Sequence, residues 1–240
     1  MKLRVIPLFL VAALAFTLAQ AAPDTAQTER AAAAAILSFG RLPTTMEASG
    51  GGSVAELIAA HRQQLATDAA LKRAVVMKAL ADAFGRAPTT AEVTADSAGT
   101  ATYTELMQQH VQWLAAHPDE YTKVLNRVYQ LVIRRDVYPE EIEYWKKKDV
   151  QSFAVLVGCV DNWGRRNQPG LMVTAGPAAV SVNCVFLTTV RLSPAVAAEA
   201  RAAAGLPAVA DPSAGTNVLA AGADKIISDG RIHFAAALKD

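Results

Sequence analysis

The sequence predicts an all-α fold for its main part, built from antiparallel helical repeats and followed by a short extended, β-like C-terminal region. Two observations carry this prediction. Apolar residues recur at helical spacing from about residue 24 to residue 163. A short motif that ends one helix and starts the next occurs three times in that stretch.

The first 21 residues have the pattern of a cleavable secretory signal peptide. Lys2 and Arg4 precede an apolar run over 5–19 that carries no charge and is shorter than a membrane span of about 20 residues. The run ends in Ala-Gln-Ala, the small-x-small pattern that signal peptidases cut. We therefore expect an extracytoplasmic protein, periplasmic or secreted, that begins near Ala22 and has no membrane span after cleavage. An uncleaved anchor helix is the alternative, and the acidic residues just downstream disfavour it.

Charge and composition narrow the classes of partner and the kind of core. The chain has 23 Lys and Arg against 22 Asp and Glu, and signal cleavage would remove two of the basic residues. Because nucleic-acid binding needs clustered positive charge, we expect no nucleic-acid partner. Apolar residues make up 52% of the chain, but much of this is alanine, which favours helix and buries little area per residue. Thin helix-on-helix packing is therefore expected.

The repeated motif combines a glycine, an arginine and a proline. Its members are Gly40, Arg41 and Pro43 in the first copy, and Gly85, Arg86 and Pro88 in the second. The glycine suits the left-handed residue that follows a helix, and the proline prevents the helix from continuing. A threonine with a glutamate three residues later then forms a capping box for the next helix.

The third copy is looser. Arg134 stands where the first two copies have glycine, Arg135 follows it, and Pro139 comes later than the prolines of the other copies. Since an arginine does not favour the left-handed conformation, we expect this helix end to be built differently. Each arginine has two interpretations, an anion-binding site or a partner of helix carbonyls and a nearby glutamate, and we favour the second.

Between the motifs, helical spacing and cap residues predict further helices. Ser53 with Glu56 and Thr102 with Glu105 are capping pairs, and Asp68 has the type of an N-cap. The predicted helices cover 53–65, 68–80, 102–114, 118–132, 139–148 and 150–163. Small and polar residues at 49–53 and 95–100 indicate joints.

The C-terminal part changes character. Residues 181–191 are β-branched and predict an extended segment, 194–204 predict a short alanine-rich helix ended by Gly205, and short apolar pairs in the tail suggest strands. The predicted organisation is a signal peptide (1–21), a helical repeat domain (22–163), a disulfide-tied extended segment with a short helix (164–205), and a linker with a Gly/Ala-rich tail (206–240).

The two cysteines, Cys159 and Cys184, predict one disulfide. An exported protein meets an oxidising compartment, where an even pair of cysteines closes readily. Closing a loop of about 25 residues would stabilise the fold by roughly 3 kcal/mol. The alternative is a reactive thiol, which needs an activating group that the neighbouring sequence does not supply.

The stretch around the third motif resembles a known family. Tyr129, Ile133, Arg135, Asp136 and Trp145 match the pattern of a secreted helical repeat domain of unknown function that is thought to share its fold with phycobilisome linker polypeptides. Arg134 departs from that pattern, which has glycine there, and Pro139 comes two residues late. The resemblance implies an all-helical, extracellular, non-catalytic module of surface and assembly proteins, and it brings no catalytic residues.

The sequence predicts no catalytic, cofactor-binding or metal-binding site. His110 and His117 are seven residues apart but lack a third ligand, and the glutamates at 140–143 suit a helix start. Trp113, Trp145 and Trp163 are expected to be core anchors between helices.

These observations predict an exported, non-catalytic structural or interaction protein, a scaffold whose partner is another exported protein or an envelope component. The alternative is an extracytoplasmic helical enzyme such as a hydrolase. A cleft in which Glu141, His110 or Arg135 converge would favour the enzyme.

Overall fold

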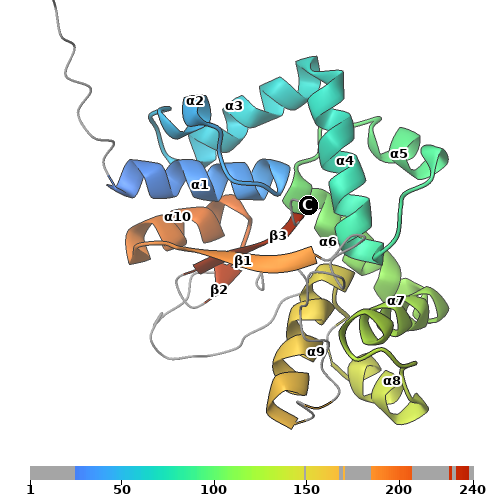
Figure 1. Ribbon diagram of the computed structural model, residues 1–240. Coiled ribbons are helices and arrows are strands. Elements are labelled where there is room, and N and C mark those ends of the chain that lie inside the picture. The colour runs from blue at the N-terminus through green and yellow to red at the C-terminus, as the bar shows by residue number, and fades with distance from the viewer. Residues whose placement is uncertain are drawn as a thin grey trace, which may run out of the picture.

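A computed structural model describes residues 25–148, 150–167, 170, 185–206, 227–228 and 231–237. The chain forms ten α-helices and three β-strands within these ranges (Figure 1). The all-α prediction for the main part is confirmed, since α1 to α9 follow one another without a strand between Thr25 and Asn167. The predicted signal peptide lies outside the described residues, and in the part described here no helix is long and apolar enough to cross a membrane.

The nine helices form three repeats, each with a long, a short and a long helix. The bounds are α1 Thr25–Phe39, α2 Thr45–Ala48 and α3 Val54–Thr67; α4 Ala69–Phe84, α5 Thr90–Asp96 and α6 Tyr103–Ala116; α7 Pro118–Val132, α8 Pro139–Lys146 and α9 Phe153–Asn167. The two long helices of each repeat pack on each other, and the first long helix also packs on the last helix of the next repeat, α1 on α6 and α4 on α9. Each repeat therefore completes the core of its neighbour.

The predicted N-termini of the helices are confirmed, because the capping hydrogen bonds expected there are formed. Ser53 and Thr102 each accept a bond from the backbone of the glutamate three residues on, and that glutamate bonds back to the cap residue. The same box forms at Thr44 and Thr89 before the short helices. Asp68 caps α4. These local bonds satisfy backbone donors that a helix start would otherwise leave unpaired.

All three motifs contain a left-handed residue after the helix, which the sequence did not predict for the third. Gly40 and Gly85 are left-handed, with φ of 68° and 65°, and Arg134 is left-handed as well, with φ of 61°. The third helix end still differs in its C-cap, which is Ile133, donating its N–H to the Tyr129 carbonyl, whereas the C-cap of α4 is the left-handed Gly85 itself. A residue with a side chain adopts this conformation at a cost of about 1–2 kcal/mol, which surrounding contacts must offset.

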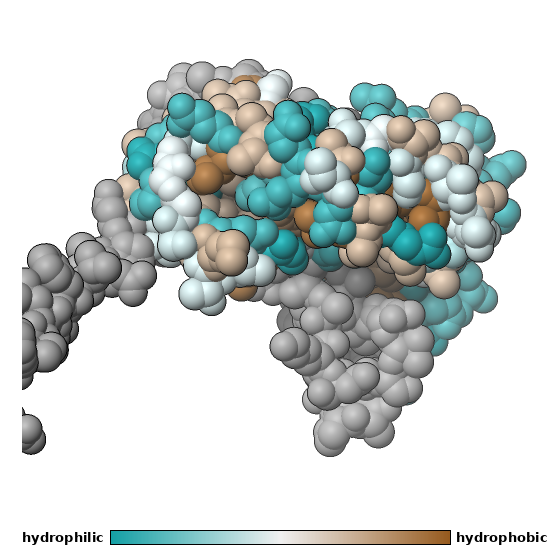
Figure 2. Space-filling view, turned by 90° about the horizontal axis from the view of Figure 1, so that it is seen from above, coloured by the Kyte–Doolittle hydropathy of each residue, from teal (hydrophilic) through white to brown (hydrophobic). Residues whose placement is uncertain are grey.

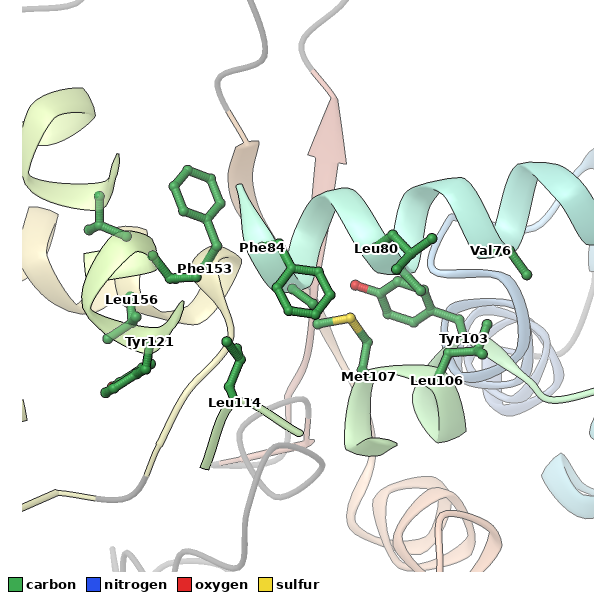
Figure 3. Packing of buried hydrophobic residues seen from close by; sticks show 14 of the residues in the cluster. Val76, Leu80, Phe84, Tyr103, Leu106, Met107, Leu114, Tyr121, Phe153 and Leu156 are labelled. Carbon is green, nitrogen blue, oxygen red and sulfur yellow. The ribbon is translucent and has the colours of Figure 1, made fainter. Parts of the chain in front are cut away.

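The buried residues form two clusters. The larger one runs through all three repeats and includes Leu80, Phe84, Tyr103, Leu114 and Phe153 (Figure 3). The smaller one joins α1 and α3 to helix α10, Pro194–Ala203. Five consecutive alanines of α1 are buried, so small side chains allow helices to pack closely around α1.

The C-terminal region folds back on the repeats. Strands β1 (Val185–Arg191), β2 (Ile227–Ser228) and β3 (Arg231–Ala237) form an antiparallel sheet in the order β1-β3-β2. The extended segment and the short alanine-rich helix predicted here are confirmed. The sheet packs on α1 and α9, and α10 packs on α1 and α3.

Candidate functional site

The most distinctive side-chain arrangement is the repeated turn after α1, α4 and α7. Arg41 makes a two-pronged ion pair with Glu47, with Nη1–Oε2 of 2.8 Å and Nη2–Oε1 of 2.9 Å. Arg135 makes the same pair with Glu141, and both distances are 2.7 Å. Such paired bonds between planar groups are strong and directional.

The second turn is built alike. Arg86 Nη1 donates to Glu92 Oε2 at 2.9 Å, and Nη2 donates to the other carboxylate oxygen. In all three turns the arginine also donates to the carbonyl of the residue that follows it. The arginine therefore holds the chain as it leaves one helix and enters the next.

The same glutamates close each turn from the other side. Glu47 accepts the backbone N–H of Thr44 at 2.7 Å, and Glu92 accepts that of Thr89 at 2.7 Å. The hydrogen bond from Arg41 lowers the pKa of Glu47 to about 2, and the bond from Arg86 lowers the pKa of Glu92 to about 2. At Glu141, desolvation raises the pKa, but the bonds to Arg135 and to the backbone outweigh it, so the pKa is lowered. All three carboxylates are held in their charged form.

Each motif arginine also lies over an aromatic ring. The guanidinium carbon is 4.8 Å from the ring centroid of Phe39 for Arg41 and 5.4 Å from that of Phe84 for Arg86. Arg135 lies between two rings, those of Tyr129 and Tyr138. Together with the ion pairs, this favours the interpretation of these arginines as parts of the turn over that of an anion site, because an anion would have to displace a bonded carboxylate.

The glycines of the first two turns are contact points between repeats. A Cβ on Gly40 would lie 2.7 Å from a ring carbon of Tyr103, and one on Gly85 would lie 2.3 Å from a ring carbon of Phe153. Tyr103 and Phe153 are the first residues of α6 and α9, the last helix of the next repeat. The glycine is therefore needed for space as well as for its left-handed backbone.

From the sequence, these glycines were expected only to supply the left-handed backbone conformation after a helix. The signal for the packing role was an aromatic residue directly after the N-cap of α6 and α9. This spacing became meaningful only once the structure showed which helix receives the ring.

The third turn departs from glycine where the array ends. Arg134 is exposed, and the described chain continues after α9 as strand β1 and helix α10. Polar side chains of α7 hold this turn instead. Asn126 accepts the backbone N–H of Val137 at 3.1 Å, and Gln130 donates to Asp136 at 2.7 Å.

A buried polar cluster lies beside the first turn. Asp82 accepts hydrogen bonds from Lys78 at 2.7 Å and from the Tyr103 hydroxyl at 2.8 Å. Desolvation raises the pKa of Asp82, and the two donors oppose that rise. The Lys78 side chain lies next to Gly40, with its Cε 2.9 Å from where a Cβ on Gly40 would stand. In the next repeat, Arg127 donates to the Phe84 carbonyl at 2.9 Å. These contacts join one repeat to the next.

The tryptophans fall into two groups. Trp145 is half-buried and donates to the Tyr129 hydroxyl at 3.0 Å, so it anchors α8 on α7 as predicted. Trp113 and Trp163 are 42% and 39% exposed, and the expectation that they are core anchors is wrong. Trp113 stacks on His117 with ring centroids 3.9 Å apart and meets the core residue Phe84 edge-on at 5.6 Å, so it lies at the rim of the core rather than inside it.

The two histidines considered for a metal site have different neighbours. His117 stacks on Trp113, and its Nδ1 is 2.7 Å from the Trp113 carbonyl oxygen. His110 is buried, and its Nε2 is 3.3 Å from Asp96 Oδ2. Among the described residues, no three His, Cys, Asp or Glu side chains are grouped so as to hold a metal ion.

The predicted disulfide stays a prediction. Cys159 is half-buried on α9, and Cys184 lies outside the described residues.

One cavity of about 230 Å³ lies between α1, α3, α6 and the end of α10. Leu37, Ile58 and Ala204 line its apolar part. Arg62 and Glu105, also in the lining, make a two-pronged ion pair with distances of 2.9 and 2.5 Å. Because these two charges satisfy each other, the cavity offers a ligand little unpaired polar chemistry.

The residues named for the enzyme alternative do not converge on a cleft of their own. Arg135 and Glu141 bond to each other in the third turn, whereas His110 lies on α6 beside Asp96. Comparison with protein-family models, with curated proteins and with solved structures found no match. Function must therefore be argued from the geometry alone.

Proposed function

We propose that this chain is an exported, non-catalytic structural or interaction protein, a scaffold made of helical repeats. One observation carries the proposal: the same turn occurs three times, and each time its arginine and glutamate form an ion pair with each other that connects two helices. Groups that perform chemistry are usually left available to a substrate. Here the chain instead repeats a device for ordering helices in space, as repeat proteins that present binding surfaces do.

The surface offers places for a partner on the turns and short helices. Large apolar side chains that are about half exposed or more lie on or just before these helices: Leu42 precedes α2 and Met46 lies on it, and Tyr138 precedes α8 and Tyr144 lies on it. Met46 is 85% exposed. On the face shown in Figure 2, strongly hydrophobic residues lie singly among polar and weakly hydrophobic ones. Exposed aromatic and methionine side chains are typical anchors at protein interfaces.

Export and family relationship are parts of the same proposal. The apolar start of the sequence and its Ala-Gln-Ala site support secretion to the periplasm or beyond. The repeated turn, with Arg135 and Trp145 in the places that the resemblance requires, supports kinship with the secreted repeat domain related to phycobilisome linkers. The partner would then be another exported protein or an envelope component.

In-cell crosslinking followed by pull-down from the native envelope tests the proposal. We expect a defined partner to be recovered with the wild-type chain and lost with Met46→Gln or Tyr144→Gln. Met77→Gln, a matched change of a less exposed residue on the long helix α4, should leave recovery intact. The scaffold proposal would be contradicted if the pull-down recovers no partner and the purified protein degrades an envelope polymer.

A further inference from the structure

Two buried histidines occupy equivalent places in the first two repeats. His61 follows the N-cap Ser53 of α3 by the same spacing as His110 follows the N-cap Thr102 of α6. Each lies against the phenylalanine that ends the first helix of its repeat, with ring centroids 4.4 Å apart for His61 and Phe39. The third repeat has the buried Val160 at this place. The repeated position is thus one that a non-titrating side chain can fill.

His61 is enclosed without a carboxylate of its own. It is 4% exposed, and its Nδ1 lies 3.1 Å from the Ser38 hydroxyl. The Arg41 guanidinium lies over Phe39, the ring that His61 packs on. Burial lowers the pKa of His61, with Arg41 acting in the same direction and Glu47 and the Ala34 backbone opposing it. Glu47 is already bound to Arg41, so it cannot turn to the imidazole.

His110 differs because a carboxylate faces it. Its Nε2 lies 3.3 Å from Asp96 Oδ2, and neither atom has a hydrogen-bond partner among the described residues. Burial lowers the pKa of His110 too, but Asp96 and Glu92 oppose this. A proton arriving at His110 would find a counter-charge in place, whereas one arriving at His61 would not.

We propose that His61 is an acid-sensitive switch in the first repeat. When His61 takes up a proton, α1, α3 and α10 separate from one another while the second and third repeats stay folded. The link to α10 is direct, because Ile58 lies one turn before His61 on α3 and shares the smaller core cluster with Val196. Opening would uncover that apolar surface.

The direction of the pH effect on opening follows from the protonation of His61 in the closed and in the open first repeat. Above pH 6.5, the ordinary pKa of histidine, His61 is neutral in both the closed and the open repeat. As the pH falls below that value, the open repeat binds the proton first, so opening gains favour steadily. Asp82, which reaches the same turn through Tyr103, has a raised pKa. Its protonation acts in the opposite direction and cannot cause the opening.

Hydrogen exchange on the full chain, read by mass spectrometry at pH 7.5 and pH 5.0 and normalised to an unfolded reference, tests this. In the wild type, peptides from 25–67 and 194–206 should lose more protection at pH 5.0 than those from 69–167, because the open first repeat binds the proton more readily than the closed one. His61→Gln should remove the difference, and the matched variant His110→Gln should keep it.

Equal loss of protection across the chain, or an unchanged acid response in His61→Gln, would overturn the proposal. If His61→Gln does not fold, the ring resonances of wild-type His61 followed by NMR through the same pH range decide. We expect His61 to titrate below pH 6.5, and titration at or above that value would refute the proposed switch.

Discussion

The contact between Gly85 and Phe153 yields the sharpest prediction on stability. In Gly85→Ala the new Cβ must occupy a point 2.3 to 2.6 Å from three carbons of the Phe153 ring, so the ring or a helix has to shift. The left-handed backbone of Gly85 (φ 65°) costs an alanine about 1 kcal/mol, and overpacking a buried ring costs about 1–3 kcal/mol more. We therefore expect unfolding to become easier by about 2–4 kcal/mol.

Urea denaturation measures this loss, and two further variants isolate its cause. Gly51→Ala is the matched control, because a Cβ there meets nothing within 4 Å and the backbone is not left-handed; its effect should stay below about 0.5 kcal/mol. In a Phe153→Ala background the ring is gone, so adding Gly85→Ala should cost only the backbone share of about 1 kcal/mol. The reasoning is refuted if Gly85→Ala costs the same with and without the Phe153 ring.

Four other outcomes are expected. Arg134→Gly should stabilise the protein by up to about 1 kcal/mol in urea, because it relieves a left-handed side chain that packs on no following repeat; destabilisation would count against this. Glu92 has a pKa of about 2 in the fold, below its ordinary 4.5, so its stabilisation is present above pH 4.5 and lost as the pH falls towards 2; acid titration of unfolding should show that Glu92→Gln removes this part of the pH dependence. Non-reducing peptide mapping of the exported protein should find Cys159 linked to Cys184, and two alkylatable thiols would exclude the bond. Intact mass of the exported form should place its first residue at Ala22 or one residue later, and a retained leader would disprove cleavage.

The local parts of the fold could be predicted because their causes are local. The capping boxes at Thr44 and Ser53 depend on residues three apart, and the structure contains both. The helical spacing of apolar residues likewise follows from neighbours in sequence, although α9 continues to Asn167, beyond the predicted end at residue 163. The partner of each motif arginine was also accessible, since the glutamate lies only six residues on.

The contacts between repeats could not be predicted in this way. Nothing near Gly85 in sequence indicates that Phe153 will lie on it, and the left-handed conformation of Arg134 was not foreseen because residues with a side chain rarely adopt it. The exposure of Trp113 shows the same limit. A large apolar side chain predicts burial on average, but only the arrangement of helices decides which rings the core has room for.

The two ends of the described array differ from the contacts between its repeats. Val54, the first residue of α3, stands where Tyr103 and Phe153 stand in the later repeats, but the described residues contain no earlier repeat whose turn could receive it. Helix α10 takes that place: Val196 lies in the same buried cluster as Val54, and Glu199 accepts the Val54 backbone N–H at 3.4 Å while pairing with Arg30.

At the other end, an exposed arginine and polar side chains replace the glycine contact. Terminal repeats commonly carry a polar outer face, because an exposed apolar face would favour aggregation. A partner is expected to meet the short helices, which carry the exposed side chains of Met46 and Tyr144. The pull-down variants at those two positions therefore test the architecture together with the function.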